Sequence, residues 1–206
     1  PIRFGGKIAG AWCNMRRLAI TLFILLSAFV ASAQSLLDTF EQSLAKLGAY
    51  KVCFTVNLDD SYTLTGEYVV EGTNFYVGIN GSELYVADGV KYEVTVEKRE
   101  VVIDSAESLG SDVLSNPAKA FARLKEQYNV EQTEVGGRAA VNLTAKSGEH
   151  SATVVADSSG VLPEFIVYTE EGSSVKITFT SITGHKDSLP RFDRAKYAGY
   201  EVIDMR

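Results

Sequence analysis

The sequence is poor in the residues that build most catalytic and metal centres. It has only 2 His and 2 Cys in 206 residues. Neither an H-x-x-H nor a C-x-x-C spacing occurs, which excludes the commonest zinc motifs. A G-x-S-x-G turn and a glycine-rich phosphate loop are also missing. We therefore expect no catalytic residue, no metal and no cofactor, and we predict that the protein is not an enzyme.

The few candidate reactive residues have simple structural interpretations. His150 and His185 stand beside glycine-containing turns, and we expect both to be exposed loop residues. Cys53 falls on the less apolar side of an expected strand and is predicted to be a small packing residue. Asp59-Asp60 fits a solvated turn better than a pair of acid–base carboxylates.

Residues 15–34 have the order of a secretory signal peptide. Arg16 and Arg17 precede an apolar run over 18–30, and the small residues that follow predict cleavage after Ala33. The alternative is an uncleaved anchor, but the run is shorter than the roughly 20 apolar residues of a spanning helix. No Cys stands at the cleavage point, so we do not expect a lipid anchor.

The chain left after cleavage is acidic and of single-domain size. Residues 1–14 precede the first Met and are expected to be upstream read-through, which leaves 34–206 as one domain. This part has 16 basic and 26 acidic residues, a net charge of −10. Such a balance argues against nucleic acid, whose affinity comes from Lys and Arg on phosphates. Cys53 alone cannot form an intramolecular disulfide, so an apolar core must hold the domain together.

Two helices are predicted from apolar spacing and capping signals. Apolar residues recur every three or four positions over 36–47. A second helix is expected over 117–128, with Asn116 as its N-cap and Pro117 in its first turn. A shorter helical turn is expected within 105–114.

Elsewhere apolar residues alternate with polar ones, which is typical of half-buried strands. Asn80-Gly81 and Asp88-Gly89 predict tight hairpin turns between such strands. The expected strands are 50–58, 62–71, 75–79, 83–87, 90–96, 101–103, 130–135, 138–143, 151–156, 165–169, 175–182 and 201–204. Residues 183–200 have a weak pattern and are expected to form a long surface segment.

These elements predict a mainly β fold with short helices. Strands and helices do not alternate, so a parallel sheet is not expected. The predicted architecture is an incomplete, half-open antiparallel β-barrel with a helical lid over an apolar cavity. A two-sheet sandwich is the alternative.

Apolar and aromatic side chains on the strands are the candidates for a binding cavity, because ligand pockets are largely apolar. A packed core explains the same pattern equally well. The cavity candidates are Tyr50, Val52, Phe54, Leu64, Tyr68, Phe75, Val77, Tyr85, Tyr92 and Phe165. The lid candidates are Leu37, Phe40, Leu44, Phe121 and Leu124.

Several short motifs, taken in order, resemble those of a known family. They are Y-K-V-x-F-T-V from Tyr50, G-E-Y-V-V-E-G-T-N-F-Y from Gly66, Leu162-Pro163 and the closing stretch 196–204. In this order they are similar to the periplasmic outer-membrane lipoprotein carrier family, LolA, in its divergent LolA-like branch. The resemblance spans essentially all of 34–206.

The resemblance implies a half-open barrel closed by helices and a soluble, monomeric periplasmic protein. The implied partners are lipoprotein acyl chains, an inner-membrane lipoprotein-releasing complex and an outer-membrane lipoprotein receptor. Phe75 falls where the family has an apolar cavity residue. Glu71-Gly72 replaces the family's usual Arg-Pro, so the latch of the lid must differ here or be missing. A lipid- or lipoprotein-sensing module and, more remotely, an exported hydrolase are the alternatives.

Overall fold

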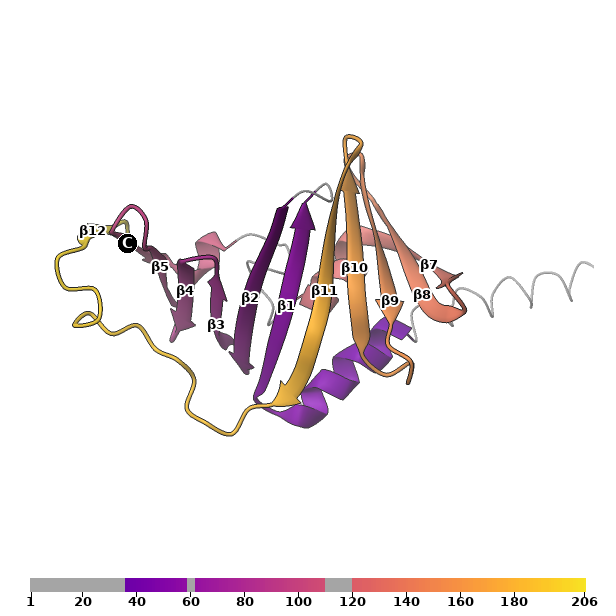
Figure 1. Cartoon of the computed structure of the whole chain (residues 1–206), viewed down its shortest axis with the longest axis horizontal. Coiled ribbons are helices and arrows are strands. Elements are labelled where there is room, and N and C mark those ends of the chain that lie inside the picture. The colour runs from indigo at the N-terminus through magenta and orange to yellow at the C-terminus, as the bar shows by residue number, and fades with distance from the viewer. Residues whose placement is uncertain (1–35, 59–61, 110–119) are drawn as a thin grey trace, which may run out of the picture.

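The computed structural model describes residues 36–58, 62–109 and 120–206, and the signal-peptide prediction lies outside these ranges. Twelve strands of this part form one open sheet (Figure 1). Their bounds are β1 Tyr50–Leu58, β2 Tyr62–Glu71, β3 Asn74–Ile79, β4 Ser82–Ala87, β5 Val90–Thr95, β6 Glu100–Ser105, β7 Tyr128–Val135, β8 Arg138–Ala145, β9 His150–Ala156, β10 Pro163–Glu170, β11 Ser173–Gly184 and β12 Glu201–Asp204.

The sheet consists of two meanders that meet where β1 pairs with β11. The strand order is β12-β6-β5-β4-β3-β2-β1-β11-β10-β9-β8-β7. The half-open antiparallel architecture is thereby confirmed, and the two-sheet sandwich is wrong. One pair departs from the expectation: β12 runs parallel to β6. The reason is that residues 185–200 carry the chain along the sheet before it joins that edge (Figure 1).

Short helices accompany the sheet. The first helix is described over 36–47, and α2 spans Ala120–Gln127. The expected start of α2 at Pro117 lies outside the described residues. Between β6 and α2, a 3-10 turn, η1, spans Ala106–Ser108, and the Ser105 hydroxyl accepts a hydrogen bond from the Glu107 amide at its start.

The two helices pack on one face of the sheet, which we call the inner face. One apolar cluster there contains Phe54, Tyr68 and Phe75 from β1–β3, together with Leu44 from the first helix. A second cluster joins Leu37 and Phe40 of the same helix to residues of β8–β10. Phe121 of α2 contacts both clusters, so the inner face is one continuous apolar surface.

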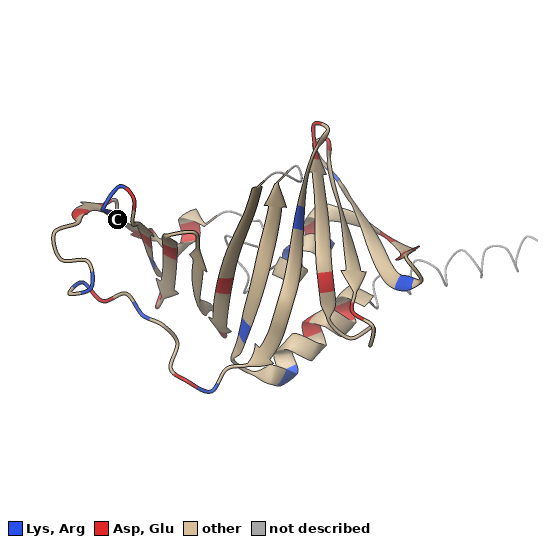
Figure 2. Ribbon diagram, in the orientation of Figure 1, with Lys and Arg blue, Asp and Glu red and all other residues tan. Residues whose placement is uncertain are grey.

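The opposite, outer face has its own apolar cluster over β4–β6. Tyr85, Val94, Val101 and Ile103 are buried there beneath Tyr197 of the C-terminal segment 185–200. This segment carries charges of both signs along its length (Figure 2). It is therefore a surface segment as expected, but it also covers a core.

Candidate functional site

The inner face brings together seven of the ten cavity candidates. Strand register places Val52, Tyr68 and Val77 side by side on β1, β2 and β3. The ring of Phe54 lies directly against Gly66, where an added Cβ would stand 2.6 Å from the ring. The seven are Tyr50, Val52, Phe54, Leu64, Tyr68, Phe75 and Val77; Leu64 packs against the first apolar cluster, and the other six belong to it.

The structure places the other three candidates on the outer face. Phe75 lies opposite Val86 on the inner face, so Tyr85 and its partner Tyr92 point the other way. They form part of the outer cluster with the C-terminal segment. Phe165 also lies outside, under the Lys176 ammonium at 4.4 Å from its ring centre. The expectation that these three line the inner cavity is wrong, because β4 and β10 have apolar residues on both faces and the apolar face of β5 is the outer one.

All five lid candidates pack on the inner face. Leu37 and Phe40 join the second cluster, Leu44 joins the first, and Leu124 of α2 packs against the second. The Phe40 and Phe121 rings lie 6.1 Å apart, so the two helices also contact each other. The helices therefore form one lid rather than two separate covers.

A lysine connects the two lid helices. The Lys125 ammonium on α2 lies 2.7 Å from an Asp38 carboxylate oxygen and 2.5 Å from a Glu41 carboxylate oxygen. These hydrogen bonds raise the pKa of Lys125 above its ordinary value. Sequence reasoning missed this contact because 87 residues separate Lys125 from Asp38.

The lid closes tightly on the sheet. One space beneath it, between described residues, has a volume of about 10 Å³, which is room for about one water molecule. Its walls are Leu44, Tyr50, Tyr68, Ala120, Phe121, Leu124, Pro163, Ile166, Phe179 and Ile182. Burial raises the pKa of Tyr50 to about 12, so its hydroxyl stays neutral.

The outer face carries a larger, open groove of about 610 Å³ between β2–β4 and the C-terminal segment. Tyr76 and Glu67 line it on the sheet side, and Tyr200 lines it on the other. The Glu83 carboxylate at its edge accepts hydrogen bonds from the Tyr76 hydroxyl and the Lys196 ammonium. Polar and apolar groups both line the groove, which lies on the face opposite the lid.

The histidines differ from their sequence-based expectation. His150 is half-buried and contacts the rings of Tyr128 and Tyr168 at centre distances of 5.4 and 5.9 Å. His185 is also half-buried, and its Nε2 atom finds no hydrogen-bond partner among the described residues. Neither is an exposed loop residue, because tertiary packing folds neighbouring elements over each of them.

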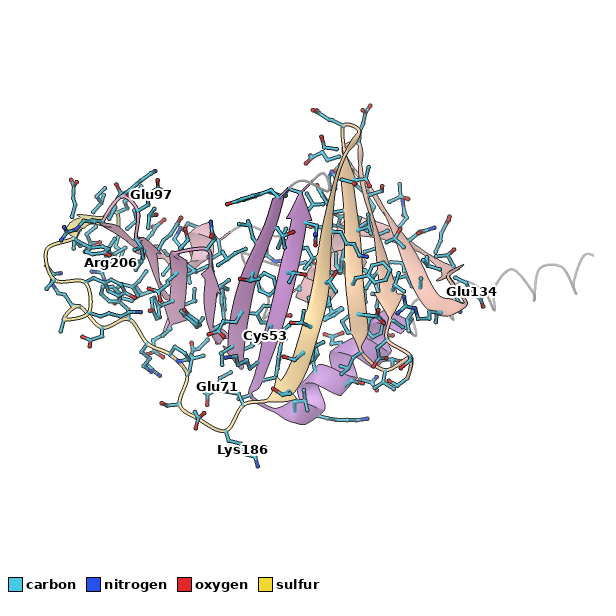
Figure 3. All side chains as sticks on the ribbon, in the orientation of Figure 1. Cys53, Glu71, Glu97, Glu134, Lys186 and Arg206 are labelled. Atoms are coloured by element: carbon cyan, nitrogen blue, oxygen red, sulfur yellow. The ribbon has the colours of Figure 1, made fainter. Side chains whose placement is uncertain are left out.

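Within the described ranges, neither Cys53 nor the acidic residues form a group that could bind a metal ion. Cys53 carries a free thiol, is half-buried, and lies within β1 (Figure 3). No group of three or more His, Cys, Asp or Glu side chains is arranged to hold a metal ion in this part of the chain. Asp59-Asp60 lies outside the described residues.

Comparisons with known proteins are informative at the level of the fold. No protein-family model and no curated protein sequence matches this chain. Among solved structures, an uncharacterized conserved protein from Thermus thermophilus matches 84% of this chain and 99% of its own, with a TM-score of 0.53 and 10% identity. The LolA superfamily protein NE2245 from Nitrosomonas europaea matches 81% and 97%, with a TM-score of 0.40 and 10% identity.

The described fold is therefore shared with the Thermus thermophilus protein. The likeness concerns the path of the chain, because at such identities individual residues do not correspond. LprF from Mycobacterium bovis is a further match, with a TM-score of 0.43 and 13% identity over 78% of this chain and 97% of its own. Within the described residues, no helix has the length and apolar character needed to cross a bilayer.

Proposed function

We propose that this protein is a periplasmic carrier that binds the acyl chains of lipoproteins and moves them from the inner to the outer membrane. The observation that carries the proposal is the continuous apolar inner face beneath a lid held by one lysine. Opening that lid exposes Phe40, Leu44 and Phe121 together with the strand residues that they cover. An acyl chain then replaces the lid's apolar contacts with its own.

Transfer energies explain why such cargo needs a carrier. Each CH₂ group of an acyl chain gains about 0.8 kcal/mol on burial, so a long chain in water costs on the order of 10 kcal/mol. A free lipoprotein would therefore stay in its membrane. A carrier must also release its cargo, and a lid that refills the site with its own side chains lowers the cost of emptying it.

The proposal includes the partners that such a cycle needs. They are an inner-membrane lipoprotein-releasing complex as donor and an outer-membrane lipoprotein receptor as acceptor. The outer-face groove and the sheet edges remain accessible when the inner face is occupied, and no catalytic step is required of the carrier. Sequence resemblance supports this assignment, together with the apolar inner face.

Mass spectrometry of the protein purified from the periplasm, without detergent, is the decisive experiment. The carrier hypothesis predicts acylated protein or lipid bound at up to one molecule per chain. A matched variant, Leu44→Asp, places a charge in the lid and is expected to abolish that binding. The proposal is overturned if the native protein contains no acylated molecule and takes none up from micelles. Recovery of a signalling protein in place of lipoproteins would favour the sensing alternative.

A further inference from the structure

An aromatic cluster continues the apolar inner face at one end of β7, β9 and β10. Tyr128 and Tyr168 both pack against the second apolar cluster while remaining partly exposed. His150 stands two residues before Ala152, a member of that cluster, so its side chain shares the inner face. Its ring contacts both tyrosine rings. The three rings thus extend the wall of the apolar site toward solvent.

Polar atoms gather where this wall ends. Glu170 lies directly opposite His150 across β9 and β10. The Tyr168 hydroxyl donates a hydrogen bond to the Glu170 carboxylate at 3.3 Å. Burial and, next, the Glu170 charge raise the pKa of Tyr128. Ring faces therefore line the apolar side, and hydroxyl, imidazole and carboxylate groups stand at the outer end.

Carboxylates predominate around this polar end, and the Lys146 ammonium of the β8–β9 turn donates to the carbonyl oxygens of Lys125 and Glu126. Glu171 follows Glu170 in the β10–β11 turn, whose tip is acidic in Figure 2. Glu149 precedes His150. Lys176, the cation nearest along β11, lies on the outer face over Phe165. An anionic group at this end of the inner face would meet carboxylates.

We propose that Tyr128, His150, Tyr168 and Glu170 form the head-group end of the acyl-binding face and select uncharged head groups over anionic ones. The fitting ligand has an acyl chain along the apolar clusters and a neutral hydroxyl-, ester- or amide-bearing group at the four residues. This inference rests on the proposed function. It gives the carrier a means of rejecting anionic phospholipids, whose chains resemble those of the acylated cargo.

Two competing lipids with the same acyl chain test whether the site selects uncharged head groups. 1-Palmitoylglycerol is neutral and 1-palmitoyl-lysophosphatidylglycerol is anionic, and each is used to displace N-phenyl-1-naphthylamine from the full protein at low salt. We expect the neutral lipid to bind about fivefold more tightly, as one unscreened charge contact predicts, and the preference to shrink as salt is added. Glu170→Gln should reduce the preference by strengthening anionic binding.

Two controls separate the possible outcomes. Glu97→Gln removes the same charge from a turn at the far end of the sheet (Figure 3) and should leave the preference unchanged. Tyr168→Phe should weaken binding of the neutral lipid alone. If both lipids bind equally and Glu170→Gln changes nothing, the head-group inference is wrong although the carrier function stands. If neither lipid displaces the dye, the carrier function itself fails.

Discussion

The Lys196 ammonium lies 2.8 Å from the Glu83 carboxylate, although 113 residues separate them in the sequence. The Tyr197 hydroxyl donates to the same carboxylate, and the Tyr85 and Tyr197 hydroxyls lie 2.7 Å apart. This network fixes the C-terminal segment on the outer face. The segment in turn covers an apolar cluster that the sheet would otherwise expose.

Glu83→Gln should make stability less dependent on pH in the acid range. Burial alone would raise the pKa of Glu83, but hydrogen bonds from Lys196, Tyr197 and Tyr76 outweigh it and lower the pKa below the ordinary 4.5. A carboxyl whose pKa is lower in the folded state than in the unfolded state stabilises the fold at pH values above its unfolded-state pKa. This contribution is lost as the pH falls through the folded-state pKa. Urea unfolding at several pH values should therefore show the variant and native curves converging below pH 4.5. If the stabilities of the variant and the native protein differed by the same amount at every pH, the hydrogen bonds to Glu83 would not have the role described here.

Phe192→Ala should loosen the C-terminal segment. The Phe192 ring stacks on Tyr92 at a centre distance of 4.5 Å and on Tyr197 at 5.4 Å. Its removal should cost about 2–3 kcal/mol of unfolding free energy, toward the lower end for a Phe because the side chain is half-buried. It should also expose apolar surface and promote association, which light scattering can detect. Tyr62→Ala, at an exposed aromatic position, is the control.

Gly66→Ala should destabilise the centre of the inner face. A Cβ there would stand 2.6 Å from the Phe54 ring and 2.8 Å from the Gly78 carbonyl oxygen, and the second contact is backbone. Such overpacking costs about 1–3 kcal/mol. Gly184→Ala is the matched control, since its Cβ would meet nothing closer than 3.9 Å. Equal unfolding midpoints for the two variants in urea would refute the close packing described here.

Lys125→Gln should free the lid with little loss of overall stability. The lysine joins the two lid helices through Asp38 and Glu41, and a partly exposed ion pair contributes at most about 1 kcal/mol. Stopped-flow binding of an apolar dye should therefore become faster while the urea midpoint shifts only slightly. Lys98→Gln, in an exposed turn, should leave the rate unchanged. An unchanged rate in Lys125→Gln would show that the lid is not held by this contact.

The strands were predictable because local signals fix them. The predicted bounds of β1 and β2 match the structure, and Asn80 and Asp88 adopt the positive φ values of 45° and 53° that their hairpin turns require. The inner position of Phe54 and Phe75 also follows from alternation along their strands.

The faces of β4 and β10 were not predictable in the same way. Tyr85 and Val86 are both buried, one on each face, so alternation cannot say which faces the lid. The answer depends on the C-terminal segment, whose own sequence pattern is weak. Likewise, the contacts of His150 and Lys125 join residues distant in the chain, and no local signal marks them.

The central β1–β11 pairing sets the order in which this protein can be built. Tyr50 of β1 pairs with Gly184 of β11, so the two halves of the sheet join only after nearly the whole chain has been synthesised. Closing so long a loop is slow, and the unjoined halves expose both strands that later meet. The sheet can therefore be completed only after the last quarter of the chain has been synthesised. Under the proposed periplasmic function, the chain would cross the membrane before this pairing forms.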